Sequence, residues 1–353
     1  AGAAQAHAAP VLDVVLNTCR DASWRVRWSV ASQFHTIVEA LGPAHAPALS
    51  GAFLNNLLLD PEPEVRTAAA AVVTKIALLL PNELVVSQVL PRVKEQATDQ
   101  SDHVRAALAS VVNDLAPVLG REHTIAHLLP LILDLLRDEN SEVRLNIIGK
   151  LGSINDVIGV DLLNQALLPV ISALAADHKW RVRLAIIEHM PMLAKQLGTT
   201  FFNEKLCDQC ILWLSDCVFA IRMAAAENLK NLTDLFGSEW CASLILPRVG
   251  PMHTHENHIH RLMSLVAVQT LSKSLSPIMV HQHVLPVVIN LSTDPVPNIR
   301  FNVAKTLQSL ATQVDAPVVS ADIQPCLSSM LGDDDRDVKY FANCALVTLV
   351  ASA

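Results

Sequence analysis

The sequence has few aromatic residues and no long apolar run. Phe, Trp and Tyr make up 4% of the 353 residues although 51% are hydrophobic, so Ala, Val, Leu and Ile must form most of the core. No apolar run reaches the roughly 18 residues that span a bilayer, and Thr74 and Lys75 interrupt the most apolar stretch, 68–80. We find no signal-peptide pattern. We therefore expect tightly stacked helices and no membrane partner.

Clustered positive charge and patterned cysteines are also missing. The formal net charge is −8, and the basic residues are spread along the chain. A nucleic-acid-binding protein more often has a clustered basic face, so we expect no nucleic-acid partner. The seven cysteines are irregularly spaced, which favours unpaired thiols in a reducing compartment.

Motifs for catalysis and metal binding are absent or incomplete. There is no Gly-rich phosphate loop and no Gly-x-Ser-x-Gly motif. Cys207 and Cys210 form a CxxC pair with Cys217 nearby, but a structural zinc site needs a fourth ligand. We interpret these cysteines as buried thiols and predict no cofactor, no metal and no catalytic residue.

Four histidines crowd one short segment: His253, His255, His258 and His260. Imidazoles at such spacings can bind a metal, but we interpret the segment as a turn that has diverged from its counterparts. Enzymes of a helical-repeat architecture exist that carry His-Glu pairs on facing helices. The one His-Glu here, at His255, has no partner in the same repeat phase, so an enzyme is the less favoured alternative.

A 39-residue unit recurs along the whole chain. Its basic position, usually preceded by Val or Ile, is occupied by Arg27, Arg66, Arg105, Arg144, Arg183, Arg222, Arg261, Arg300 and Lys339. Six residues earlier stand Asp21, Asp60, Asp99, Asp138, Asp177, Asp216, His255, Asp294 and Asp333. A fixed period of about 40 residues indicates a solenoid. We predict a single array over 1–353, with repeats at 8–46, 47–83, 84–124, 125–163, 164–201, 202–240, 241–279, 280–318 and 319–353.

Each repeat contains two amphipathic helices. In the second half of the fifth repeat, Val182, Ile186, Met190 and Leu193 fall at helical spacing. Gly198 follows, where a left-handed residue would end the helix. The first half is also helical but contains Pro169, and the same phase holds proline in five further repeats. Because proline removes a backbone hydrogen bond, we expect a shared bend there.

The Asp and the Arg of each repeat lie at the turn between its two helices. We expect the Asp to cap the second helix and the Arg of the next repeat to donate to that Asp, which gives an Asp–Arg ladder along the array. Breaking a partly buried pair of this kind costs about 3–5 kcal/mol, so we interpret the ladder as structural. His255 replaces one Asp, which predicts a weak seam between repeats six and seven or seven and eight.

The repeat resembles the HEAT repeat, so the expected fold class is an all-α, α-α superhelix of about nine helix pairs. Several strings go further, among them WRVRLAIIEHMPMLAKQLG, NLKNLTDLFGSEW and LPVVINLSTDPVPNIRFNVAKTLQ. They resemble the scaffold A subunits of type 2A serine/threonine protein phosphatases. The resemblance covers essentially the whole chain and implies that it holds the C-terminal nine repeats of such a scaffold.

The resemblance implies a non-catalytic protein that joins a phosphatase catalytic subunit with a regulatory B-type subunit in a heterotrimer, in the cytoplasm and also the nucleus. Family turns that bind the catalytic subunit match Trp180, Arg181, Phe219, His258, Arg261, Val296, Pro297, Asn298 and Arg336. Phe219 and His258 replace tyrosines of the family, which removes the hydroxyl there. Trp24 and Arg25 hold the matching turn in the first repeat and would face a regulatory subunit.

The turn between the helices is the natural contact surface of such an array, and Trp and Arg are the residue types that most often dominate binding energy. Trp180 and Arg181 are therefore the first candidates, while sequence grounds alone leave equally open that Trp180 only covers its neighbouring repeat. The competing interpretation is a transport or adaptor protein of the karyopherin kind. Those proteins recognise cargo through acidic or Trp-Asn arrays, which the second helices here lack.

Overall fold

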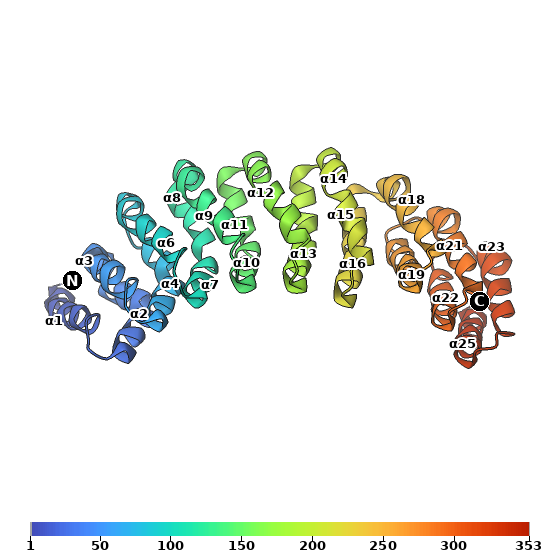
Figure 1. The fold of residues 1–353 in the computed structure, drawn as a ribbon, viewed down its shortest axis with the longest axis horizontal. Coiled ribbons are helices and arrows are strands. Elements are labelled where there is room, and N and C mark those ends of the chain that lie inside the picture. The colour runs from blue at the N-terminus through green and yellow to red at the C-terminus, as the bar shows by residue number, and fades with distance from the viewer. Residues whose placement is uncertain (1, 353) are drawn as a thin grey trace. The chain divides into compact units, whose positions relative to one another are not determined.

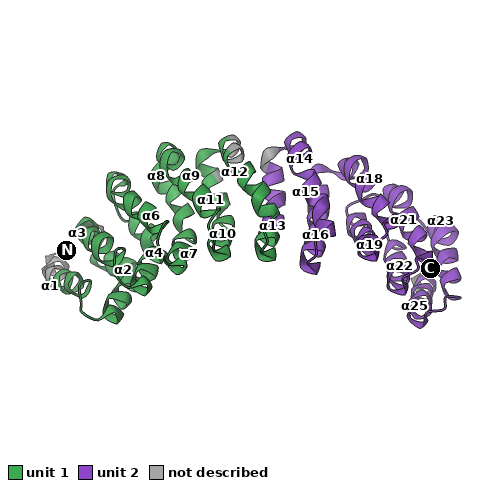
Figure 2. Ribbon diagram, viewed as in Figure 1, with its two compact units in different colours: residues 1–185 green, residues 186–353 purple. Residues whose placement is uncertain are grey.

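The structure is a computed structural model that describes residues 2–352. The description does not extend to the side chains of residues 2–9, 43, 155, 160, 161, 163–165, 196, 197, 351 and 352. Within 2–352 every regular element is a helix. The chain divides into two compact units, residues 1–185 and 186–353, and the division falls inside helix α13 (Trp180–Leu197) (Figure 2).

Unit 1 consists of helix pairs in two rows (Figure 1). The second helices, which follow the Asp of each repeat, are α2 (Trp24–Leu41), α4 (Pro63–Ala77), α7 (Asp102–Ala109), α10 (Ser141–Ile148) with α11 (Leu151–Ile158), and α13. The first helices are α1 (Gly2–Thr18), α3 (Ala46–Ala52), α5 (Asn82–Leu84) with α6 (Leu90–Gln96), the part of α8 (Ala116–His123) after the break at Gly120 with α9 (Leu129–Leu135), and α12 (Val160–Ala175). The part of α8 before Gly120 ends the second helix of repeat three.

Unit 2 repeats the same plan. Its second helices are the remainder of α13, then α16 (Phe219–Phe236), α19 (His258–Ser272), α22 (Pro297–Leu310) and α25 (Arg336–Ser352). Its first helices are α14 (Thr199–Lys205) with α15 (Cys207–Leu212), α17 (Ser238–Trp240) with α18 (Leu246–Val249), α20 (Pro277–Met279) with α21 (Leu285–Asn290), and α23 (Ala316–Val318) with α24 (Gln324–Met330). Val182, Ile186, Met190 and Leu193 are buried, as the helical pattern predicts.

The repeated proline follows a widened helical turn. π-Helical turns at Val85–Val89, Thr124–Leu128, Cys241–Ile245, Val280–Val284 and Val319–Ile323 join the two parts of the first helix. Each ends two residues before the proline of its repeat, the first one before Pro91. Because proline has no N–H and its ring collides with the carbonyl of the preceding turn, a π-turn accommodates it without ending the helix. Pro169 differs, since it lies inside the continuous helix α12.

Two second helices are interrupted, contrary to the prediction of a continuous helix. In the third repeat α7 ends at Ala109 and a short 3-10 turn follows at Val112–Leu115. In the fourth, α10 ends at Ile148 and α11 begins at Leu151. The side chain of the preceding repeat binds a carbonyl beside each break: Thr74 Oγ1 donates to the Val111 carbonyl at 2.9 Å, and Asn113 Nδ2 to the Ile147 carbonyl at 3.2 Å.

The glycines between repeats have positive φ, but not the left-handed helical conformation that was predicted. At Gly198 φ is 76° and ψ is 163°, and Gly42, Gly120, Gly159 and Gly237 are similar. Positive φ with extended ψ is a region that glycine alone occupies readily. After Gly159, Gly198 and Gly237 the first helices α12, α14 and α17 begin three or four residues before the predicted repeat starts at 164, 202 and 241.

No helix among the described residues is long and apolar enough to cross a membrane.

Candidate functional site: the turns between the helices

The Asp of each repeat forms a local turn with the residue that directly precedes the second helix. Asp60 Oδ1 accepts from the backbone N–H of Glu62 at 3.0 Å, and Asp294 Oδ1 accepts from Val296 N–H at 2.8 Å. The other repeats have the same contact. The acceptor therefore binds the N–H of the N-cap residue itself, whereas a capping side chain binds an N–H inside the helix. The prediction that the Asp caps the second helix is therefore wrong: the Asp forms a turn that precedes the cap.

The Arg of each repeat joins two turns. Arg27 Nη1 donates to the carbonyl of Asp21 in its own repeat at 2.7 Å, while Nε and Nη2 donate to the Asp60 carboxylate of the following repeat at 2.6 and 2.9 Å. The predicted ladder is present, but its direction is reversed: in every described rung the Arg binds the Asp of the next repeat, not of the previous one.

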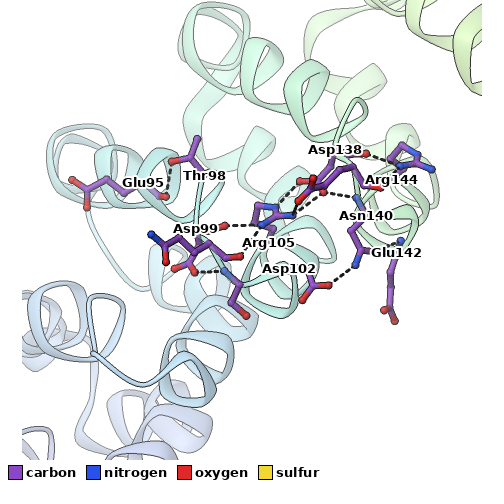
Figure 3. A network of polar contacts seen from close by, with 12 residues as sticks. Glu95, Thr98, Asp99, Asp102, Arg105, Asp138, Asn140, Glu142 and Arg144 are labelled. Carbon is purple, nitrogen blue, oxygen red and sulfur yellow. Dashed lines mark hydrogen bonds and ion pairs between the residues drawn. The ribbon is translucent and has the colours of Figure 1, made fainter.

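Six rungs of this Asp–Arg ladder are described, and Figure 3 shows the contacts of Arg105 with Asp99 and Asp138. In unit 1 the rungs are Arg27–Asp60, Arg66–Asp99, Arg105–Asp138 and Arg144–Asp177; in unit 2 they are Arg261–Asp294 and Arg300–Asp333. Arg183 and Asp216 belong to different units, and their predicted membership of the ladder stays a prediction.

The rungs are buried ion pairs. The side chains of Arg27 and Asp60 are 13% and 1% exposed. Burial by itself would raise the pKa of Asp99, but the hydrogen bonds from Arg66 and the Ser101 N–H outweigh it and hold that pKa below its ordinary value. The hydrogen bond from Arg300 likewise lowers the pKa of Asp333. A buried pair that is lost at one partner costs about 3–5 kcal/mol, so these residues hold neighbouring repeats together.

One rung is broken, between repeats six and seven. His255 takes over the local role of the Asp, since its Nδ1 accepts from Asn257 N–H at 3.0 Å. It offers no carboxylate to Arg222, whose Nε is buried and has no hydrogen-bond partner among the described residues. The next rung, Arg261–Asp294, is intact. Of the two predicted places for a weak seam, the structure therefore supports the one between repeats six and seven.

A second histidine lies at the same seam. His260 occupies the position that Val or Ile holds in the other repeats. Its ring stacks on that of His255 with centroids 4.0 Å apart, and its Nδ1 lies 3.1 Å from Ser215 Oγ. Burial, together with the nearby His255 and Arg222, lowers the pKa of His260. The seam has thus lost both a carboxylate and an apolar side chain.

The two Trp-Arg turns have exposed, internally stacked side chains. Trp180 is 38% exposed, and the Arg181 guanidinium lies 5.4 Å from its ring centroid. Arg25 lies over Trp24 at 4.7 Å. Trp24 is half-buried, whereas Arg25 and Arg181 are exposed. The ring and guanidinium are held together by a cation–π contact before any partner arrives, which lowers the entropy lost on binding.

The other candidate residues lie in unit 2, in the turns that open α16, α19, α22 and α25. Phe219 is 63% exposed and touches Arg222, while His258, Pro297, Asn298 and Arg336 are exposed and Val296 is half-buried. Arg261 is different. Each of its three side-chain nitrogens donates, to Asp294 or to the carbonyls of His255 and Glu256. Its described contacts therefore make it a member of the ladder.

Sequence reasoning missed a column of residues that directly follow the ladder cations. In unit 1 it contains Trp28, Thr67, Ala106, Leu145 and Leu184, and in unit 2 Met223, Leu262, Phe301 and Tyr340. Trp28 is 46% and Tyr340 61% exposed. The 39-residue period could have found the column, but only the structure shows that these side chains reach the surface.

The cysteine and histidine clusters do not form a ligand set. Cys207 and Cys210 are buried as predicted, and burial raises the pKa of both thiols. Cys217 is exposed. Among the residues that the structure describes, no three His, Cys, Asp or Glu side chains are placed to hold a metal ion.

Comparison with protein families finds three matching segments. Residues 49–120 match the model of a PPP2R1A-like HEAT repeat, residues 121–296 match a PIK3R4-like middle domain, and residues 284–314 match the HEAT repeat. None of the three covers half of the chain. Together they identify HEAT repeats in its sequence.

Relatives among characterised proteins match shorter parts of the chain. The regulatory A subunit of protein phosphatase PP2A from Saccharomyces cerevisiae is 40% identical over 126 residues, which are 33% of this chain and 20% of that protein. The PP2A 65 kDa regulatory subunit of Drosophila melanogaster is 45% identical over 62 residues, 18% of this chain and 10% of that protein. The matches thus span a fifth or less of each relative's length.

Solved structures with the same fold are larger solenoids. A structure of Kap121p bound to Nup53p superposes with a TM-score of 0.77 at 16% identity and covers 97% of this chain and 37% of its own. A Kap95p structure with RanGDP has a TM-score of 0.73 at 17% identity, covering 97% and 45%. At such identities the likeness is one of fold alone. It confirms an all-helical HEAT-repeat solenoid.

Proposed function

Since the chain is a HEAT-repeat solenoid with segments similar to A subunits of phosphatase 2A, we propose that it is a non-catalytic scaffold for a serine/threonine phosphatase. In this proposal the chain corresponds to the C-terminal nine repeats of such a scaffold. It binds the catalytic subunit through the turns of repeats five to nine and holds a regulatory B-type subunit beside it, in a heterotrimer. The cytoplasm, and the nucleus as a second location, would be its place of action.

One observation carries the proposal: the ladder leaves the turn residues free to bind. The Asp and Arg of each rung satisfy one another in the interior. The residues between them, such as Trp180, Arg181 and Phe219, take no part in a rung and are exposed. Trp and Arg at the centre of an interface typically contribute most of its binding energy. Holding two partners on one array raises the effective concentration of each for the other.

The proposal is tested by calorimetry with purified phosphatase 2A catalytic subunit. We expect tight binding by the chain and a loss of about thirtyfold or more for Trp180→Ala/Arg181→Ala, since hot-spot truncations cost about 2 kcal/mol or more. Glu139→Ala/Glu142→Ala, in the matching turn of repeat four, is the control and should bind as the unmodified chain does. A folded chain that does not bind would refute the scaffold function. Equal binding by the double variant would keep the function and move the site.

The proposed contact with a regulatory B-type subunit is tested separately. With the catalytic subunit bound, Trp24→Ala/Arg25→Ala should weaken capture of a regulatory B-type subunit while leaving the catalytic-subunit affinity unchanged. Loss of both affinities together would indicate misfolding of the first repeat, which the circular dichroism spectrum checks.

A further inference from the structure

A hollow in unit 1 lies between Trp28, one helical turn beyond Trp24 on α2, and the turns of repeats two and three. Its volume is about 240 Å³, and it is lined by Trp28, Pro63, Glu64, Thr67, Ser101 and His103. The column of residues that follows the ladder cations explains it. Trp28 is large, whereas the column positions in the next two repeats hold Thr67 and Ala106. A large side chain followed by two small ones leaves a space with an aromatic wall.

The exposure of Trp28 indicates that this wall is a contact surface. The side chain is 46% exposed on α2, although a Trp at this position could have been covered by a larger residue at 67. Removing apolar surface from water contributes roughly 25 cal/mol per Å², and Trp is the residue type most enriched in binding hot spots. The hollow has room for one large apolar side chain of a partner.

The turns of repeats two to four carry charge of one sign, whereas the turn of repeat one, beside Trp28, carries the exposed Arg25. Between the ladder Asp and the Val of repeats two, three and four stand five acidic residues and no Lys or Arg: Glu62, Glu64, Asp102, Glu139 and Glu142. Asp102 accepts from Asn140 Nδ2 at 2.6 Å, and Glu139 lies 3.6 Å from Arg105 Nη2. Glu62 and Glu64 are exposed and have no ion-pair partner among the described residues, and Glu64 lines the hollow itself. Charges of one sign favour a partner of the opposite sign.

We propose that this face of unit 1 docks a basic segment of a partner protein. One Leu, Met or Phe of the segment enters the hollow against Trp28, and a neighbouring Lys or Arg pairs with Glu62 and Glu64. The site adjoins the Trp24–Arg25 turn on α2, whose exposed charge is positive, but its lining does not include those two residues. The proposal does not require the partner to be the catalytic subunit or a regulatory subunit, so its test is independent of the proposed function.

The test uses a library of random dodecapeptides displayed on yeast. Binders of the full chain are enriched, and binders of a Thr67→Trp variant are removed, because the larger side chain fills the hollow from an exposed helix face. We expect a consensus with at least two Lys or Arg around one large apolar residue. The selected peptide should bind the unmodified chain at least about tenfold more tightly than Thr67→Trp and than Glu62→Lys/Glu64→Lys. Leu145→Trp, two repeats further along the same column, is the control and should leave the affinity unchanged.

Three outcomes would overturn the proposal. An acidic or uncharged consensus would assign the hollow to a different kind of partner. Equal affinity for the unmodified chain and Thr67→Trp would place the peptide elsewhere, provided that both melt at the same temperature. Self-association of the chain in analytical ultracentrifugation that Thr67→Trp abolishes would show that a second copy covers the hollow.

Discussion

His255 shows how much of a repeat one residue controls. It keeps the backbone contact of the turn through Nδ1, so the turn itself survives. The link to the previous repeat does not survive, because an imidazole cannot accept the paired N–H groups of Arg222 as a carboxylate does. The two functions that Asp combines in the other repeats are separated here.

Replacing His255 with Asp should complete the rung. The new carboxylate would accept from Arg222 Nε, which is buried without a partner in the described chain. Hydrogen bonds to charged groups contribute roughly 1.5–3 kcal/mol, so we expect the free energy of unfolding and the melting temperature to rise. Calorimetric melting measures both. Asp294→His, which copies the defect into the next rung, should lower them, and an unchanged or lower value for His255→Asp would contradict the assignment.

The lowered pKa of His260 predicts a loss of stability in mild acid. In the folded chain burial, then His255 and Arg222, oppose its protonation, and Ser215 is its one described hydrogen-bond partner. The unfolded chain takes up the proton near the ordinary His pKa of about 6.5. Because the unfolded state then binds more protons, stability falls as the pH drops below about 6.5, until folded His260 also titrates.

The pH effect is measured as melting temperature between neutral pH and mild acid. His260→Val restores the residue type of the other repeats and should flatten the profile in this range. His103→Val, at an exposed histidine of unit 1, is the control and should not. A profile that His260→Val leaves unchanged would assign the acid sensitivity to other histidines.

At the scale of the helix, backbone hydrogen bonding decides where the regular pattern fails. Proline inside a first helix is accommodated by a π-turn, which keeps the two halves in one rod. Where a second helix is interrupted, a side chain of the preceding repeat binds a carbonyl at the break. The Val111 and Ile147 carbonyls also accept from the backbone N–H groups of Asp114 and Lys150, so at each break the side chain adds a second hydrogen bond that joins two repeats.

Asn113→Leu should therefore destabilise unit 1. The side chain is fully buried and its Nδ2 donates to the Ile147 carbonyl between α10 and α11. The Ile147 carbonyl keeps the backbone N–H of Lys150 as a donor at 3.1 Å, so the variant loses one hydrogen bond of about 0.5–1.5 kcal/mol, which denaturant unfolding would measure. Asn302→Ala is the matched control, since the side chain of Asn302 bonds, among the described residues, only to Asn298 in its own helix. A loss for Asn113→Leu no larger than that of the control would show that water or relaxation replaces the contact.

At the scale of the whole chain, one structural ladder supports turns of different chemistry. Repeats one and five present Trp-Arg, repeats two to four present acidic residues, and repeat six presents Phe219. Because the ladder does not use these positions, the turn residues can differ from repeat to repeat, and so suit different partners, without a change in the ladder. Trp180→Ala/Arg181→Ala should accordingly change catalytic-subunit affinity but shift stability by no more than about 0.5 kcal/mol, as surface substitutions do.

Particular residues mark how far sequence reasoning reached. The period of Asp and Arg predicted the helix pairs, the ladder and the weak seam at His255. It could do so because each repeat contacts only its neighbours, so residues that contact one another recur at a fixed spacing along the chain. The direction of the ladder was wrong, since equal spacing in both directions cannot tell which neighbour an Arg reaches. The turn residues at 180 and 219 were placed correctly at the surface, while their partners stay predictions.

The sequence by itself determined the fold class and the residues that hold it together. Periodic positions fix local helices and nearest-neighbour contacts, and both are encoded within one repeat or two. The tertiary structure decided which way each Arg turns, which of two seams lacks its rung, and where exposed side chains leave a hollow, as beside Trp28. These features depend on how side chains from successive repeats fill one space, and spacing along the chain does not contain that information.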